Sequence, residues 1–355
     1  MRIAYVNQDA GVAPSKKKGA VVHVEAMRKA FAGVGAEVLA LDIVDDRELV
    51  AELDRAHQRA PLDLVYERYA LKRCAASTFA HSHGIPHVLE VNAPLADEEE
   101  RWRDGARAAV DPSRERELFG RAMRVLAVSS DVERYCHDRG ASVERTVLTP
   151  NAVDPDLFRP RDGDAGLRSA LVPAGRLALG FHGRLRPWHN FPMLVAAMQR
   201  LIERDVPIHL LVLGEGEFER ELAQRIDPSR TTLLGWKPHA EAAAIVACTD
   251  VLPLTYSAAE PCYFSPLKLL EGMSAGAVPV VPALGDLTRV VRHEHNGLVY
   301  TADDLEALVE SISRLQRGPD LRNSLARNAR AMAETHSWTH IARSVLGLVS
   351  AENAP

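Results

Sequence analysis

The chain has 355 residues, of which 46% are hydrophobic and 26% are charged, and its formal net charge is -5. This length exceeds the size at which a single hydrophobic core usually stops growing, so two domains are expected. The negative net charge excludes the general attraction that basic proteins have for nucleic acids and anionic membranes. Any anionic ligand must therefore be bound by a local site.

The first residues, MRIAYVNQD, form a strand-like run and lack the apolar stretch of a signal peptide. No segment approaches the roughly 18 uninterrupted apolar residues of a membrane-spanning helix. The four cysteines are far apart and form no CxxC pair, which is typical of reduced thiols. We therefore expect a cytoplasmic protein without integral membrane association.

Short apolar runs alternate with helix-period segments along the chain, which predicts parallel sheets covered on both faces. The strands expected in the first half are residues 2–6, 37–41, 63–67, 87–91 and 124–129. Those expected in the second half are residues 177–183, 209–214, 231–236, 251–254, 278–282 and 297–300.

Between the two halves, residues 148–166 are rich in proline, aspartate and glycine, as is typical of a linker. The predicted fold is therefore α/β, with two doubly wound Rossmann-like domains facing across a cleft. The expected domains are residues 1–155 and 156–335, and a helix within residues 336–355 packs back on the first domain. The acidic residues 96–104 and the paired aspartates of DGD at 162–164 are expected to be solvated.

Ligands of open α/β sheets lie outside the carboxyl ends of the strands, where several polar residues occur. Arg184 comes directly after Gly183, the last residue of an expected strand, and a guanidinium there binds an oxyanion well. His189 comes one short turn later, and a nearby anion would raise its pKa and keep it protonated. The alternative is that Arg184 is a surface charge and His189 caps a helix.

The segment SPLKLLEGM, residues 265–273, has the pattern of a helix start. Ser265 is expected at the N-cap and the following proline at the first helical position. The free amides of Leu267 and Lys268 would then form an anion site, with Glu271 within reach of a ribose. The alternative is that Lys268 and Glu271 form an ordinary surface pair.

A third candidate is the loop before the first helix. Gly19 there permits close approach of a ligand to the backbone, and Lys16 to Lys18 would attract anions. The alternative is a flexible basic loop without a ligand. The chain contains no GxGxxG after its first strand, no GxxxxGK[ST], no HExxH and no GxSxG, and no metal site or cofactor is expected.

The order of several motifs resembles the retaining, nucleotide-sugar-dependent glycosyltransferases of the GT-B fold, in the large family 4 (group 1). The motifs are TPNAVDPDLFRP, GRLRPWHN, LVLGEGE, SPLKLLEGMSAGAVPVV and HEHNGLVY, and the likeness covers nearly the whole chain. The resemblance implies metal-independent sugar transfer from a nucleoside diphosphate with retained anomeric configuration.

Carried over by position, the resemblance also implies roles for single residues. Arg184 and His189 would stabilise the donor diphosphate and act as the catalytic residues. The other expected donor-binding residues are Gly19, Gly183, Trp236, Lys237, Tyr263, Phe264, Ser265, Leu267, Lys268 and Glu271.

Three positions depart from the family pattern. Tyr263 replaces a glutamate that touches the donor sugar, and His189 replaces a lysine beside the diphosphate. Asn92 replaces a histidine after the fourth strand, and an amide cannot shuttle a proton. The identity of the donor sugar and the pH dependence of donor binding are therefore the properties that these changes affect.

The acceptor is expected against the first domain, at His23, Glu67, Arg68 and Asn92. It is predicted to be a soluble small molecule, of the kind found in specialised metabolism. A same-fold sugar-nucleotide epimerase, a phosphorylase and a non-catalytic nucleotide-sugar-binding protein are the alternatives. The sequence makes no prediction of the donor base, the linkage or the oligomeric state.

Overall fold

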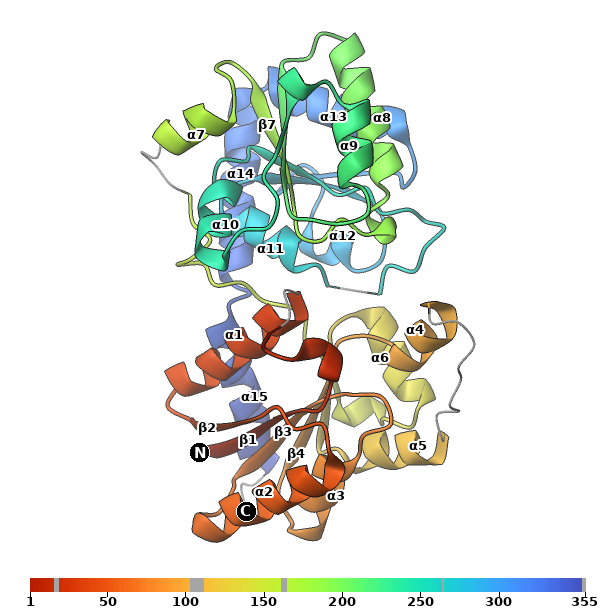
Figure 1. The fold of residues 1–355 in the computed structure, drawn as a ribbon, viewed down its shortest axis with the longest axis vertical. Coiled ribbons are helices and arrows are strands. Elements are labelled where there is room, and N and C mark those ends of the chain that lie inside the picture. Colours follow the sequence, from red (N-terminus) through yellow and green to blue (C-terminus); the bar gives the residue numbers. More distant parts are fainter. Residues whose placement is uncertain (16–18, 103–111, 161–164, 264, 353–355) are drawn as a thin grey trace. The chain divides into compact units, whose positions relative to one another are not determined.

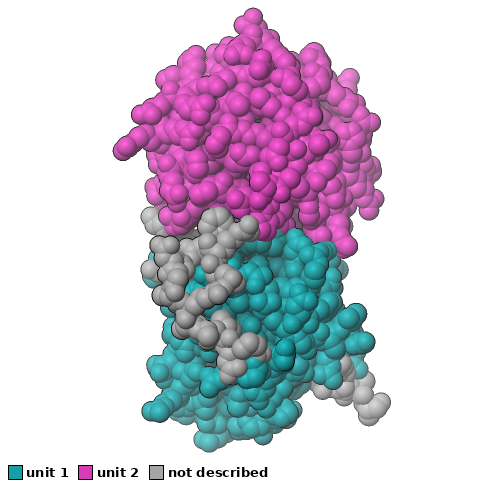
Figure 2. Space-filling model, turned by 90° about the vertical axis from the view of Figure 1, so that its right-hand side faces the viewer, with its two compact units in different colours: residues 1–151, 263–265, 338–355 teal, residues 152–262, 266–337 magenta. Residues whose placement is uncertain are grey.

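The structure, a computed structural model, describes residues 1–15, 19–102, 112–160, 165–263 and 265–352. The chain divides into two compact units, coloured separately in Figure 2. Unit 1 comprises residues 1–151, 263–265 and 338–355, and unit 2 comprises residues 152–262 and 266–337. Both ends of the chain therefore belong to unit 1.

Unit 1 contains a six-stranded sheet in the order β2-β1-β3-β4-β5-β6, and all of its neighbouring strands are parallel. The strands are β1 (Arg2–Asn7), β2 (Glu37–Leu41), β3 (Leu64–Arg68), β4 (His87–Val91), β5 (Arg124–Ala127) and β6 (Thr146–Leu148). Every residue of β3 and β4 is buried. This burial is typical of a parallel sheet, because helices cover both of its faces.

The helices of unit 1 connect these strands, and one of them comes from the far end of the chain (Figure 1). They are α1 (Gly19–Gly33), α2 (Asp46–Arg59), α3 (Ala75–Ser82), α4 (Leu95–Trp102), α5 (Pro112–Arg121), α6 (Ser130–Asp138) and α15 (Trp338–Glu352), with 3-10 turns at Ala10–Val12 and Val143–Arg145. Helix α15 packs against α1. Its Trp338 ring makes an edge-on contact with His23 of α1 at 4.8 Å between ring centroids.

Unit 2 contains a second six-stranded sheet, in the order β12-β11-β10-β7-β8-β9. Its strands are again parallel. They are β7 (Leu177–His182), β8 (Ile208–Leu213), β9 (Thr231–Leu233), β10 (Val251–Pro253), β11 (Val278–Pro282) and β12 (Leu298–Tyr300).

The helices of unit 2 are α7 (Ala165–Leu171), α8 (Phe191–Glu203), α9 (Glu219–Arg225), α10 (His239–Val246), α11 (Leu267–Ser274), α12 (Leu287–Val290), α13 (Leu305–Arg317) and α14 (Pro319–Glu334). Two 3-10 turns accompany them, η3 (Pro187–His189) and η4 (Pro228–Arg230).

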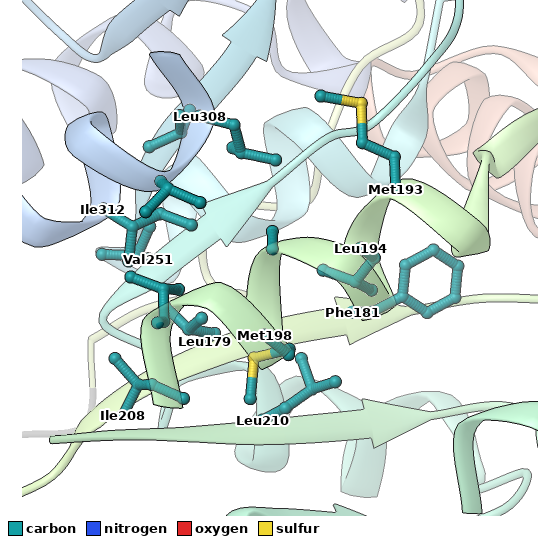
Figure 3. Close-up of a cluster of buried hydrophobic side chains, with 14 of the residues drawn as sticks. Leu179, Phe181, Met193, Leu194, Met198, Ile208, Leu210, Val251, Leu308 and Ile312 are labelled. Atoms are coloured by element: carbon teal, nitrogen blue, oxygen red, sulfur yellow. The ribbon is translucent and has the colours of Figure 1, made fainter. Parts of the chain in front are cut away.

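Alternate residues of β7 face two different hydrophobic clusters, as the period of a strand requires. Leu179 and Phe181 belong to the larger cluster, in which residues of β8, α8 and α13 also meet (Figure 3). Ala178, between Leu177 and Leu179 of the larger cluster, belongs to a smaller cluster with Leu211 and Val172. The carboxyl end of β7 is thus anchored from both faces, which fixes the position of the residues that follow it.

The two-sheet α/β prediction is confirmed, and three local predictions are corrected. Strand β6 was missed because Thr146–Leu148 is short and only half-buried. Residues 96–104 are not a solvated loop throughout, because α4 runs from Leu95 to Trp102 and packs Leu95 and Ala96 against the unit 1 core. Helix α11 has Pro266 rather than Ser265 at its N-cap, without a side-chain cap.

Within the described residues, no helix has both the length and the apolar character needed to cross a membrane.

Candidate functional site

The candidate site lies where the strand order of unit 2 changes direction. β7 and β10 are neighbours, with β8 and β9 on one side and β11 and β12 on the other. In doubly wound sheets this switch point opens a crevice at the carboxyl ends of the strands, where ligands bind. The segments that begin here are the loop after β7 and, further along the chain from β10, helix α11.

The floor of the site is formed by backbone, because a glycine directly follows both β7 and β8. Gly214 has φ of 143°, and a Cβ built on it would lie 1.9 Å from the carbonyl oxygen of Gly183. Gly216 is similar, since its Cβ would lie 2.3 Å from the carbonyl oxygen of Leu185. Only glycine allows the two loops to approach this closely. This approach brings the loop after β8 against the loop that carries Arg184.

Glu271 of α11 is the most constrained carboxylate of the site. Nε2 of His182, the last residue of β7, lies 3.0 Å from its Oε2, and Nε2 of His239 lies 3.6 Å from its Oε1. Burial alone would raise the pKa of Glu271, but the hydrogen bonds and charges of the two histidines outweigh it and lower the pKa to about 2. Glu271 is therefore an anion at every physiological pH, suited to accept hydrogen bonds from ligand hydroxyls.

His189 differs from its expected role as a cation. It ends the short helix η3, is buried, and its Nε2 lies 2.8 Å from Nζ of Lys268. Burial and then the charge of Lys268 lower the pKa of His189 to about 2. In this structure His189 is therefore neutral, whereas a cation was expected beside a bound anion, and the cation next to position 189 is Lys268.

Three further predicted residues lie on the loops after β7 and β9. Arg184 follows Gly183 and is exposed. Trp236 is 43% exposed, and its backbone N–H donates to Oε1 of Glu215 at 3.3 Å. Lys237 pairs with Glu241 at 3.1 Å, one turn further along. The structure thus brings Arg184, Trp236 and Lys237 to the carboxyl edge of the same sheet as Glu271.

Residues 263 and 265 belong to unit 1. The hydroxyl of Tyr263 donates to Oε1 of Glu98 at 2.5 Å, and its carbonyl accepts a hydrogen bond from Ser129. Oγ of Ser265 accepts from the backbone N–H of Asn151 at 3.1 Å, which explains why it does not cap α11. Phe264 lies outside the described residues.

Gly19 is the first residue of α1 and is exposed. Lys16 to Lys18 lie outside the described residues, as do the aspartates at 162–164. The role of Gly19 in donor binding therefore stays a prediction.

Two of the predicted acceptor residues, His23 and Arg68, contact Glu90 in unit 1. His23 is buried, with Nε2 2.6 Å from Oε1 of Glu90 and Nδ1 2.8 Å from Oδ1 of Asn151. Nη1 of Arg68 lies 3.6 Å from Oε2 of Glu90. Burial would raise the pKa of Glu90, but His23 and Arg68 lower it to about 2.

Glu67 and Asn92 occupy different environments. Glu67 is 1% exposed, and its Oε2 meets Nε2 of His87 at 2.8 Å inside the sheet. Asn92 follows β4 directly, and within the described residues its buried Nδ2 has no hydrogen-bond partner. The same holds for Nη1 of Arg68, at the end of the neighbouring strand β3. Arg68 and Asn92 therefore remain as donors at this edge, whereas Glu67 does not reach the surface.

Two residues of the site, His182 and His239, were not predicted from the sequence. His182 ends an apolar strand, and its signal was its position directly before the glycine of GRLRPWHN. His239 begins α10, only a few residues after the predicted Lys237. Among the residues that the structure describes, no group of three or more His, Cys, Asp or Glu side chains is arranged to hold a metal ion.

Comparison with known families agrees with this geometry. Residues 176–317 match the model described as "Glycosyl transferases group 1", and residues 10–152 match the model described as "Glycosyl transferase 4-like domain". The chain is 26% identical over 318 residues to a D-inositol 3-phosphate glycosyltransferase from Stackebrandtia nassauensis, covering 84% of this chain and 70% of the relative. It is also 26% identical over 337 residues to the protein of the same name from Actinosynnema mirum, covering 89% and 79%.

Solved structures share the fold. Anabaena Alr3699/HepE in complex with UDP superposes with a TM-score of 0.75 at 21% identity, covering 99% of this chain and all of the other. Sucrose-phosphate synthase from Thermosynechococcus elongatus gives a TM-score of 0.76 at 18% identity, covering 99% of each chain.

The two family matches span most of the chain and fall on the two sheets separately. The expected fold and family are therefore confirmed. The chain belongs to the retaining, nucleotide-sugar-dependent glycosyltransferases of family 4 (group 1), with the GT-B fold.

Proposed function

We propose that this enzyme transfers a sugar from a UDP-sugar to a hydroxyl group of a soluble, oxygen-rich small molecule, without a metal ion. The observation that carries the proposal is the Glu271 carboxylate, which His182 and His239 hold at the switch point of the unit 2 sheet. An anionic acceptor of hydrogen bonds there suits the two hydroxyls of a ribose.

The uridine assignment is supported by a structural neighbour. Anabaena Alr3699/HepE was solved with UDP-glucose as well as with UDP, and it shares this fold at a TM-score of 0.74. Trp236, exposed beside the glycine-lined loops, offers an indole face to a base. UDP-glucose is therefore the first donor to test.

The proposed reaction breaks the bond between the anomeric carbon and the β-phosphate oxygen, and forms a bond from that carbon to the acceptor oxygen on the same face. The acceptor's proton passes to the departing phosphate oxygen, so no enzymic base is needed. Stabilising the charge of the leaving diphosphate is then the main catalytic task. Arg184, exposed after Gly183, is the residue we assign to it.

The acceptor site is proposed at the carboxyl edge of the unit 1 sheet. Nδ2 of Asn92 is a buried donor without a hydrogen-bond partner in the described residues, and Nη1 of Arg68 has no hydrogen bond but pairs with Glu90 at 3.6 Å. Such donors favour a ligand that brings oxygen atoms, because an unmet buried donor costs about 1–3 kcal/mol. Inositol 3-phosphate, suggested by the names of the relatives, meets this requirement with its hydroxyls and its phosphate.

The test is acceptor-dependent release of UDP. Purified enzyme is incubated with UDP-glucose and EDTA, with and without inositol 3-phosphate, inositol, fructose 6-phosphate or other small polyols. UDP release and the anomeric configuration of the product are followed by NMR. We expect release that needs an acceptor, tolerates EDTA and gives an α-linked product. An inverted product or an absolute need for a divalent cation would contradict the proposal.

A further inference from the structure

Lys268, in the first turn of α11, points its side chain at the carboxyl end of β7. Its Nζ lies 2.8 Å from Nε2 of His189 and 4.0 Å from the ring centroid of Phe181. A Cβ built on Gly183 would lie 3.6 Å from Nζ. The ammonium group is therefore next to the residue that precedes Arg184, with no side chain between Nζ and the Gly183 backbone.

This environment is unusual for a partly buried lysine. Buried cations are normally paired with a carboxylate, yet within the described residues no carboxylate lies within ion-pair distance of Nζ. The neighbours of Nζ are a neutral ring nitrogen and an aromatic face. Glu271 on the same helix acts only from a distance, and His182 and His239 already hold its carboxylate.

The distance between Lys268 and His189 also restricts their protonation. At 2.8 Å, one nitrogen donates a proton and the other accepts it, so the two groups do not carry charges together. Burial lowers the pKa of Lys268 to about 7, although Glu271 opposes the shift. Since the pKa of His189 is lowered to about 2, any positive charge of this pair belongs to Lys268.

We propose that the Lys268 side chain binds the diphosphate of the donor, and that the neutral His189 ring positions it. This inference rests on the proposed function. It extends the expected role of Lys268, which concerned only its backbone amide. It also explains how the site keeps a cation for the diphosphate although His189 replaces the lysine of the family pattern. The cation comes from α11, 79 residues further along the chain, and reaches within 2.8 Å of the His189 ring.

The pH dependence of binding follows from the groups that face Lys268. These are His189 from η3 and Glu271 from its own helix, with His182 and His239 behind Glu271. In the free protein Lys268 loses its proton above about pH 7, and a bound diphosphate restores it. UDP affinity should therefore fall by up to about tenfold per pH unit above 7, with uptake of a proton on binding.

The experiment is calorimetric titration of the full chain with UDP, and with uridine as a probe that lacks phosphate. Lys268→Met keeps the length of the side chain and removes its charge, and should weaken UDP binding about 10- to 100-fold. Uridine binding should not change. Arg327→Met, at an exposed position of α14, is the control for loss of one positive charge from unit 2.

Two further variants separate a ligand-binding role from a structural one. Lys268→Arg keeps a charge that does not titrate, so its UDP affinity should be constant between about pH 7 and pH 9. The double variant Lys268→Met/His189→Lys places a cation on η3 instead of α11. Its UDP affinity should recover most of what Lys268→Met loses. Thermal unfolding shows which variants are folded. If the double variant is unfolded, the Lys268→Arg measurement still tests the inference.

Equal UDP affinity of wild type and folded Lys268→Met would overturn the inference. The inference would also be overturned if the UDP affinity of Lys268→Arg depended on pH as in wild type. A folded double variant that bound UDP no better than Lys268→Met would overturn it as well. Wild-type protein that binds none of UDP, GDP, ADP and dTDP would instead reject the donor site itself, which is a distinguishable result.

Discussion

Nε2 of His182 lies 3.0 Å from Oε2 of Glu271, although 89 residues separate the two in the chain. The contact joins the end of β7 to α11, and His239 of α10 approaches the second carboxylate oxygen at 3.6 Å. Three elements therefore fix one charged group before any ligand arrives. Such preorganisation lowers the ordering cost of binding.

Glu271→Gln tests this arrangement directly. The amide keeps the shape of the side chain but loses the charge and one acceptor, so donor affinity should fall about 10- to 100-fold. Since Glu271 is assigned to the ribose and not to the leaving group, the KM for donor should rise while kcat changes by less than about threefold. Steady-state kinetics with UDP-glucose measure both, and a selective fall in kcat would contradict the assignment.

Arg184→Ala should act on turnover and not on folding. Removing one charged donor from a developing oxyanion costs about 100- to 1,000-fold in kcat. Because Arg184 is exposed, the thermal midpoint should remain within about 1 °C. Arg186→Ala is the matched control, since Arg186 makes a surface ion pair with Glu217 at 2.9 Å, and its kcat should stay within about twofold. Equal effects of both variants would refute the specific role of Arg184.

Gly214→Ala should destabilise unit 2. The new Cβ would lie 1.9 Å from the carbonyl oxygen of Gly183, and φ of 143° is a conformation that alanine rarely adopts. We expect a loss of about 3 kcal/mol or more in the free energy of unfolding, measured with urea. Gly166→Ala in α7 is the control, because a Cβ there would meet nothing within 4 Å. Similar stabilities of the two variants would contradict the close approach of the loops.

The Glu90 cluster predicts sensitivity of unit 1 to acid. The pKa of Glu90 is lowered to about 2 in the folded protein, against an ordinary value of 4.5. Its contribution to stability is therefore complete above pH 4.5 and is lost as the pH falls toward 2, since the unfolded chain binds the proton first.

Glu90→Gln, followed by urea unfolding, tests this contribution. The variant should be less stable than wild type near pH 6, and its stability should depend less on pH between 4.5 and 2, the range that the pKa of Glu90 sets. Parallel pH profiles of the two proteins would refute the role of the cluster.

Sequence patterns predict the sheets well because burial is nearly complete along the central strands. All residues of β7 and β8 are buried, and apart from His182 and His209 neither strand contains a polar side chain. Strand β6 and helix α4 were missed for opposite reasons. β6 has only three half-buried residues, and the acidic composition of α4 obscured the apolar pair that packs on the core.

The location of a site residue was predictable only where it follows from the order of strands and helices. Arg184 and Glu271 follow strands of a doubly wound sheet, and the rule for such sheets selects them. The contacts of Lys268 with His189 and of His182 with Glu271 were not predictable, because each joins residues about 80 to 90 positions apart. A single sequence carries no information on such distances, and the protonation of His189 depends on one of them.

The membership of α15 in unit 1 has a consequence for synthesis of the chain. Residues 266–337 of unit 2 are complete before α15 begins at Trp338, and the unit 1 core includes Trp338, Ala342, Val345 and Val349. During translation, unit 2 can therefore finish folding before unit 1. Until α15 is made, the surface of α1 that it covers in the native protein stays exposed to solvent. The unit that is translated first therefore cannot complete its core until α15 has been synthesised.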